Sequence, residues 1–302
     1  VVRPKASGPV AERFTLPPFT ILDARTGEWQ ERKRAWLTLG ISGKDGRDGE
    51  LFGFSESLLQ RQGGYFEEDG TKRNTADTSV FDPVLCELAY RWFSPAGGQV
   101  VDPFAGGSVR GIVAGALGRK YWGGELRPEQ IAANETQAED IAPSVRPVWV
   151  CGDSMETLPT APEADFVFSC PPYGDLEKYS DDPRDLSAMD WHAFVAAYKR
   201  IILRAVGRMK PDTFACFVVG DFRDGRGFYR NFVSTTIEAF EECGAMLYNE
   251  AILSTMVGTA AMRVTKQFES GRKLAKTHQN VLVFCKGDWR AAAAKCNGIG
   301  NA

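Results

Sequence analysis

The sequence predicts an α/β protein in which helices cover both faces of a mostly parallel sheet. From about residue 78 onward, short apolar runs bounded by Gly, Pro or Asp alternate with stretches whose apolar residues recur at helical spacing. Such alternation is typical of parallel strands joined by helical crossovers. The last two apolar runs, at about 246–254 and 280–285, enclose a basic loop and predict a terminal antiparallel hairpin.

Each element follows from its own run of residues. Asp82 and Pro83 open a helix that Pro95 and Gly97 close. Strands are expected at 99–102, 120–125, 147–153, 164–169, 213–221, about 246–254 and 280–285. Further helices are expected at 108–118, 128–140, 191–210 and 227–244. Ligands of such folds bind beyond the carboxyl ends of the strands, so the site is expected in the loops after Val101, Gly124, Cys151, Phe168 and Val219.

The pattern divides the chain into three parts. Residues 1–77 show little periodicity and are rich in Gly and charge, which predicts a partly irregular N-terminal arm or lid. Residues 78–288 form the α/β domain, and residues 289–302 are expected to be a flexible tail. Because the chain lacks an initiator methionine and begins in a Pro/Gly/Ala stretch, an upstream domain that is missing here stays open.

Composition excludes several classes of protein. The chain has 302 residues, 43% of them hydrophobic, which is enough for one large globular domain. No apolar run suits a membrane span or a secretory signal, so a cytoplasmic protein is expected. A net charge of −3 argues against coating nucleic acid by bulk attraction. The seven cysteines contain no CxxC pair, and His192 and His278 alone cannot make a metal site, so no metal is expected.

The loop after the first strand, DPFAGGSVRG at 102–111, has the features of a ligand-binding turn. Gly106 and Gly107 allow the backbone to pass close to a ligand. The helix that begins near Ser108 directs free amides toward a carboxylate or phosphate.

Two further acidic residues end the following strands. Glu125 lies 23 residues after Asp102, where a carboxylate can accept hydrogen bonds from ribose hydroxyls. Asp153 ends the third strand and can reach an adenine amino group. Three acidic strand ends in succession predict an adenosine ligand.

The loop after the fourth strand, SCPPYG at 169–174, narrows the chemistry. Two consecutive prolines fix the backbone, lack amide donors and leave carbonyls that suit an amine. Tyr173 offers a face on which a base can stack, worth about 1–3 kcal/mol. Because side chains alternate along a strand, Ser169 is expected to point away from the target.

With FDPVLCELAYRWF, DPFAGGS and CPPY in this order, the chain resembles the amino-methylating DNA methyltransferases, which modify adenine N6 or cytosine N4. The resemblance covers about 78–288. The segments LPPFTILDARTGEWQERKRAWLTLGI and KTHQNVLVFCKGD are similar to phage and prophage members. The resemblance implies a Rossmann-like class I methyltransferase fold, with a seven-stranded, mostly parallel sheet and a terminal antiparallel hairpin. It also implies S-adenosylmethionine as cofactor, S-adenosylhomocysteine as product, and DNA in a bacterial or phage-infected cell as partner.

The resemblance also assigns residues. It implies catalytic roles at the base-binding turn for Cys170, Pro171, Pro172 and Tyr173. The implied cofactor contacts are Asp102, Pro103, Phe104, Ala105, Gly106, Gly107, Ser108, Glu125, Asp153 and Phe81. The expected DNA contacts come from the polar loop after Tyr173 and the basic segment 254–278; they are Lys178, Tyr179, Lys266, Arg272, Lys273 and Lys276. Asp221 and Phe222, after the fifth strand, are expected to line the base pocket.

Cys170 departs from the family pattern, which has Asp, Asn or Ser before the two prolines. A thiol is a weak acceptor, so the target base stays open. One alternative makes Cys170 a nucleophile that activates C5 of a pyrimidine. Others are an RNA or protein N-methyltransferase with the same fold, and a binding module that has lost catalysis. Both a monomer and a homodimer stay open.

Overall fold

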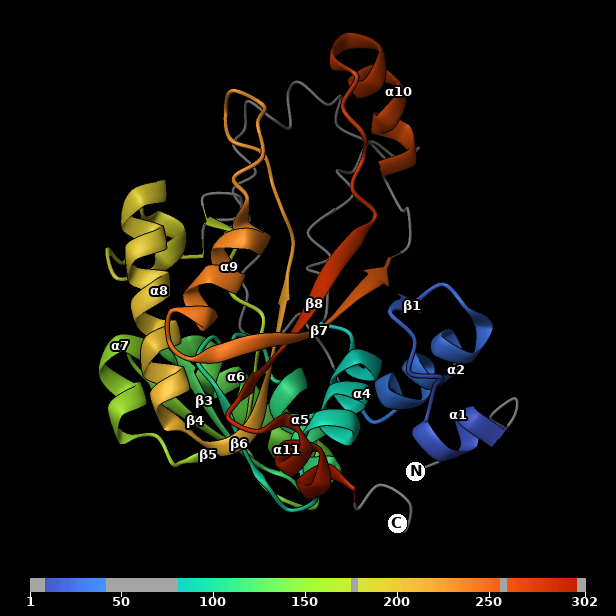
Figure 1. Cartoon of the computed structure of the whole chain (residues 1–302), viewed down its shortest axis with the longest axis vertical. Helices are drawn as coiled ribbons and strands as arrows, with labels where there is room; N and C mark the ends of the chain where they lie inside the picture. The colour runs from blue at the N-terminus through green and yellow to red at the C-terminus, as the bar shows by residue number, and fades with distance from the viewer. Residues whose placement is uncertain (1–8, 42–80, 175–178, 256–259, 298–302) are drawn as a thin grey trace.

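The computed structural model describes residues 9–41, 81–174, 179–255 and 260–297, and in this part of the chain eight strands form one sheet. The strands are β1 (Ile21–Asp23), β2 (Gln99–Asp102), β3 (Lys120–Glu125), β4 (Val148–Cys151), β5 (Ala164–Ser169), β6 (Met209–Val219), β7 (Ala245–Ser254) and β8 (His278–Lys286). Their order in the sheet is β1-β7-β8-β6-β5-β2-β3-β4 (Figure 1).

The helices connect these strands across both faces of the sheet. They are α1 (Pro9–Phe14), α2 (Gly27–Leu37), α4 (Pro83–Phe93), α5 (Val109–Ala116), α6 (Pro128–Ile141), α7 (Ser154–Thr157), α8 (Trp191–Arg208), α9 (Phe232–Glu241), α10 (Ala260–Gly271) and α11 (Trp289–Cys296). Among the described residues, no helix combines the length and hydrophobicity that crossing a membrane requires.

The sheet is parallel except at β8, which pairs antiparallel with β6 over Thr213–Val219 and with β7 over Ala245–Ser254. The predicted Rossmann-like α/β fold, a mostly parallel sheet with a late antiparallel pair, is therefore confirmed. The predicted strand number of seven is wrong, because β1 pairs parallel with the end of β7 and adds an eighth strand at that edge. A three-residue strand is too short to show a hydrophobic period, which is why the sequence pattern missed it.

The N-terminal segment is more regular than the predicted arm. Residues 9–41 contain α1, β1 and α2, with Trp29 and Trp36 of α2 buried. The buried carboxylate of Glu87 on α4 accepts hydrogen bonds from Arg32, at 2.7 and 2.8 Å, and from Trp36 Nε1 at 2.8 Å. The described part of the segment thus packs on the sheet domain rather than apart from it.

The predicted C-terminal tail begins with a helix. Asp288 caps α11 through its side chain, which accepts from the amides of Arg290 and Ala291. Ala292 and Cys296 are buried in the core. An Ala-rich run has high intrinsic helix propensity but little hydrophobic contrast, so its amphipathic face is hard to see in the sequence.

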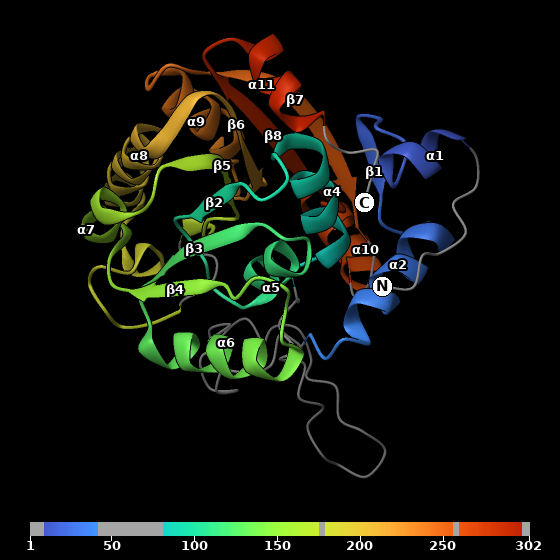
Figure 2. The same ribbon diagram turned by 90° about the horizontal axis from the view of Figure 1, so that it is seen from below.

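The core lies in two layers, one on each face of the sheet. One layer packs α2, α4, α5, α6 and α11 against the sheet, and the other packs α8 and α9. Figure 2 shows α4, α5 and α6 on the opposite side of the sheet from α8 and α9. Because both faces are covered, the carboxyl ends of the parallel strands are where a ligand can approach the sheet.

Candidate active site

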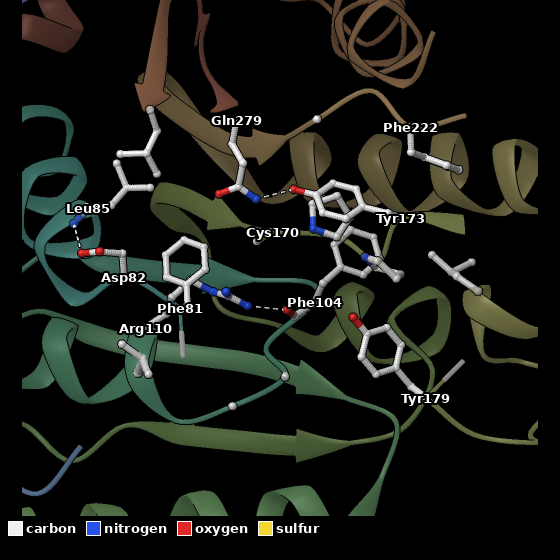
Figure 3. Close-up of a pocket in the computed structure, with 18 of the residues that line it drawn as sticks. Phe81, Asp82, Leu85, Phe104, Arg110, Cys170, Tyr173, Tyr179, Phe222 and Gln279 are labelled. Carbon is white, nitrogen blue, oxygen red and sulfur yellow. Dashed lines mark hydrogen bonds between the residues drawn. The ribbon is translucent and has the colours of Figure 1, made fainter. Parts of the chain in front are cut away.

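A cavity of about 1360 Å³ lies at the carboxyl ends of the parallel strands. Its wall combines the loop after β2, the end of β3, the turn after β5 at 170–173, the residues after β6 and the segment between α10 and β8. Figure 3 shows Phe104, Arg110, Cys170 and Tyr173 close together among the residues that line this space. The loops that sequence analysis selected therefore meet in one place.

The glycine loop leaves room for a ligand. Gly106 has φ +51°, and a Cβ on either Gly106 or Gly107 would meet nothing within 4 Å. The Gly106 amide donates to Glu125 Oε2 at 2.9 Å, and Asn134 Nδ2 donates to the Gly106 carbonyl at 2.8 Å. The Glu125 carboxylate and the Asn134 side-chain amide thus fix the backbone of the loop at Gly106.

Glu125 and Asp153 both line the cavity, as predicted. Burial raises the pKa of Glu125, while hydrogen bonds from the amides of Arg127 and Gly106 act in the opposite direction. Asp153 caps α7, where its side chain accepts from the Met155 amide at 2.8 Å. Each carboxylate oxygen has two lone pairs, so both groups keep acceptor capacity toward the cavity.

Asp102 and Ala105 do not line the cavity, although the resemblance implied that they contact the cofactor. Asp102 is fully buried, and its carboxylate accepts from Arg110 Nε at 2.6 Å and from the Tyr121 hydroxyl at 2.7 Å. It also accepts from the Phe104 amide and the Ser169 hydroxyl. With its oxygens occupied in this way, Asp102 fixes the two loops that a ligand would touch.

Arg110, which sequence analysis did not select, links the glycine loop to Phe81. Its guanidinium lies 4.7 Å from the centre of the Phe81 ring and donates to the carbonyls of Phe104 and Ala105. Burial acts to lower the pKa of Arg110, but the Asp102 carboxylate raises it above the ordinary value, so the group stays charged. Phe81 lines the cavity as predicted.

A row of buried polar side chains on α6 supports the loop and was also missed. Arg127 Nη2 donates to Gln130 Oε1, Gln130 Nε2 donates to Asn134 Oδ1, and the Ser108 hydroxyl donates to Gln137 Oε1. Amides at 130, 134 and 137 recur at helical spacing, which is a signal that the sequence did contain.

The turn after β5 presents the predicted catalytic residues to the cavity: Cys170, Pro171, Pro172 and Tyr173 line it. The Ser169 side chain is buried and points to Asp102, which confirms that it faces away from the target side. The Tyr173 hydroxyl accepts from Gln279 Nε2 at 2.7 Å, and burial raises its pKa, so it stays protonated. Gln279 was not expected at the site.

Aromatic rings surround Tyr173. The Phe232 ring packs edge-on at 6.0 Å between centroids, and the Phe222 ring lies at 6.2 Å. Phe222 and Asp221 line the cavity, as predicted. The result is an apolar wall next to a turn of fixed carbonyls, which suits a flat heterocycle carrying an amine.

Only some of the residues predicted to contact DNA line the cavity. Lys178 lies outside the described residues. Tyr179, Lys273 and Lys276 line the cavity, whereas Lys266 and Arg272 are exposed on and after α10 and do not line it. Lys276 is half-buried, its Nζ donates to the Asp221 carbonyl at 3.3 Å, and burial lowers its pKa. Arg184 and Arg223 also line the cavity and were missed.

No protein-family model matches the chain, and the comparison with curated proteins found no relative. Among solved structures, TrmN from Thermus thermophilus aligns at a TM-score of 0.48 and 15% identity, over 70% of this chain and 51% of that one. This chain therefore spans about half the length of that neighbour.

Two other neighbours differ in described function. Magnesium protoporphyrin IX methyltransferase (ChlM) from Synechocystis PCC 6803, with bound SAM, aligns at a TM-score of 0.40 and 9% identity, over 64% of this chain and 71% of that one. A provisionally assigned DNA modification methylase, also from Thermus thermophilus, aligns at 0.34 and 20% identity, over 45% and 51%. Such distant similarity does not assign a function, so the function has to come from the site residues.

Proposed function

We propose that this protein is an S-adenosylmethionine-dependent DNA methyltransferase that modifies an exocyclic amine, adenine N6 or cytosine N4. The observation that carries this proposal is that the glycine loop with Glu125 and Asp153 opens onto the same cavity as the turn at 170–173. One half suits a nucleoside cofactor and the other suits a flat amine, so donor and acceptor of a methyl group would meet in one space.

The cofactor half fits S-adenosylmethionine by the chemistry of its donors and acceptors. The space in front of Gly106 and Gly107 admits the close approach of a ligand to the backbone. Glu125 would accept from ribose hydroxyls, and Asp153 from the adenine amino group. When bound, the cofactor supplies a methyl group on a sulfonium, which is a good leaving group.

The acceptor half orients the amine. The target base would leave the duplex and stack on Tyr173, because a base inside the duplex is out of reach. The Tyr173 ring is held in place by Gln279 and by the Phe232 ring. The backbone carbonyls around Cys170 and Pro171 accept from the amino group and direct its lone pair into the cavity. Catalysis then consists mainly of orientation.

The first test compares substrate classes. The protein is incubated with methyl-labelled S-adenosylmethionine and, separately, unmethylated duplex DNA, structured RNA or a glutamine-containing peptide. We expect at least tenfold more label in DNA than in RNA or peptide. Label in RNA or peptide instead would replace DNA with that substrate, and cofactor binding without transfer would indicate a module that has lost catalysis.

A matched pair of variants tests the assignment of the two halves. Tyr173→Ala removes the stacking face, worth about 1–3 kcal/mol per base, and is expected to lower kcat on DNA while leaving cofactor affinity unchanged. Glu125→Ala is expected to weaken cofactor binding instead, as measured by calorimetry. The same loss of cofactor affinity in both variants would contradict the division of the cavity.

A further inference from the structure

The connection from β6 to α9 forms a rigid hairpin, which we call the finger (residues 222–230). Its two sides are joined by a hydrogen bond from the Arg230 amide to the Phe222 carbonyl at 2.9 Å. A second bond joins the Asp224 amide to the Phe228 carbonyl at 2.8 Å, and Arg223 pairs with Tyr229 as an isolated antiparallel bridge. Figure 1 shows this connection extending beyond the carboxyl ends of the parallel strands, at the same end of the sheet as α10.

The tip of the finger is fixed by its own side chains. Asp224 Oδ1 accepts from the amides of Arg226 and Phe228, each at 3.0 Å. Gly227 has φ +94°, a conformation that suits glycine. Because the turn is ordered before any partner binds, little conformational entropy is lost when it makes a contact.

At this tip, Phe228 stands out from the protein with 67% of its surface exposed. The neighbouring Tyr229 is held by the Arg223 guanidinium, 4.1 Å from the centre of its ring, and both residues line the cavity. Phe228 itself does not line the cavity, but it lies next in sequence to Tyr229, which does. A single exposed ring is common on protein surfaces, so the case for a partner rests on the ordered tip that carries Phe228 and on the charges around it.

The surroundings of Phe228 are basic. Arg226 Nε pairs with the Asp224 carboxylate at 3.0 Å, and 83% of the Arg226 side chain is exposed. Lys273, from the segment after α10, reaches the finger, since a Cβ on Gly227 would lie only 2.7 Å from its Nζ. An apolar ring among cations fits a polyanion with a stacked apolar interior, which is a nucleic acid duplex.

We propose that Phe228 is a wedge that enters the base stack of duplex DNA where the target nucleotide leaves it. This inference rests on the proposed function. Removing a base from the stack costs a few kcal/mol, and an inserted apolar ring recovers part of that by stacking on the bases left behind. Arg223, Arg226 and Lys273 would hold the flanking phosphates and so fix the position of the finger on the duplex.

The experiment compares Phe228→Ala with wild type on two substrates. One is a fully paired duplex; the other carries a mismatch at the target base, which lowers the cost of flipping. We expect kcat/KM of F228A to fall about ten- to hundredfold on the paired duplex and to return to within about threefold of wild type on the mismatched one. Fluorescence of 2-aminopurine at the target position should show less flipping by F228A on the paired duplex alone.

Two further variants serve as controls. Phe19→Ala, in the segment before β1, removes a ring of similar exposure, 70%, and is expected to behave as wild type on both substrates. Phe228→Leu keeps an apolar wedge and is expected to retain most of the activity. Since the Phe228 side chain is largely exposed, thermal stability should not change in either variant at this position.

The outcomes separate the two levels of the proposal. If wild type transfers no methyl group to DNA, the proposed function fails and the wedge fails with it. If wild type is active and F228A is unaffected, or loses activity equally on paired and mismatched duplexes, the proposed function stands and the wedge is refuted.

Discussion

At the scale of single residues, the site depends on side chains that hold the ligand-facing ones in place. Asp102 joins Arg110, Tyr121 and Ser169, and so fixes the glycine loop to the end of β5. Gln279 reaches from β8 to the hydroxyl of Tyr173. We expect substitutions at these positions to change the geometry of the cavity more than its chemistry.

Gln279→Leu should lower kcat about five- to tenfold, which is the effect of losing one hydrogen bond worth ~1 kcal/mol that orients Tyr173. Cofactor affinity should stay within twofold of wild type, because Gln279 contacts the turn and not the glycine loop. Steady-state kinetics and calorimetry check both values. An equal loss of cofactor affinity would mean that Gln279 supports the whole cavity.

The raised pKa of Glu125 gives a pH signature. Its carboxyl keeps its proton above the ordinary pKa of 4.5, so affinity for S-adenosylmethionine should rise as pH increases through the raised value. The unfolding free energy has the opposite sign: the Glu125 contribution is present below 4.5 and is lost as pH rises through the folded-state pKa. Glu125→Gln should remove the pH dependence of cofactor affinity and that of the unfolding free energy. If both pH dependences persist in this variant, other groups cause them.

At the scale of elements, α2 is joined to α4 through one buried carboxylate. Burial acts to raise the pKa of Glu87, but hydrogen bonds and charge from Arg32, a hydrogen bond from Trp36 and the charge of Arg91 leave it below its ordinary value of 4.5. Its contribution to stability is therefore present above pH 4.5 and is lost as pH falls through the lowered pKa.

Glu87→Gln should lower the unfolding free energy by on the order of 2 kcal/mol at pH 7. This is less than the roughly 3–5 kcal/mol for breaking a fully buried pair, because Arg32 and Arg91 can turn toward water. Denaturant unfolding measures the loss, and proteolysis within residues 9–41 should become faster. Unchanged stability would mean that the apolar contacts of Trp29 and Trp36 suffice to hold α2.

The elements also show what the sequence could and could not predict. The bounds of β2, β3 and β5 match the predicted ranges because apolar runs between Gly, Pro and Asp are local signals. The loops with Gly106 and Pro171 were found because these residues constrain the backbone wherever they occur. Gln279 could not be found in this way, since its partner Tyr173 lies 106 residues away along the chain.

At the scale of the whole molecule, a net charge of −3 has to be reconciled with the proposal that the partner is DNA. The cations proposed to contact phosphates are local: Arg223 and Arg226 lie on the finger, and Lys273 lies in the segment between α10 and β8. Binding should therefore depend on a few phosphate contacts and not on the overall field of the protein.

We expect the logarithm of the DNA association constant to fall with the logarithm of salt concentration with a slope of about −3, since each of about three contacts contributes ~0.9. Fluorescence anisotropy over a salt series measures this slope. A slope steeper than about −6 would indicate a much wider phosphate-binding surface than the cavity wall provides.

The most direct measurement of the central claim is to incubate the protein with methyl-labelled S-adenosylmethionine and unmethylated duplex DNA, digest the DNA to nucleosides and identify the product by mass spectrometry. The proposed function predicts labelled N6-methyladenine or N4-methylcytosine, and the product names the target base. Labelled 5-methylcytosine would make Cys170 a nucleophile instead, and no labelled nucleoside, with cofactor binding intact, would contradict DNA as the substrate.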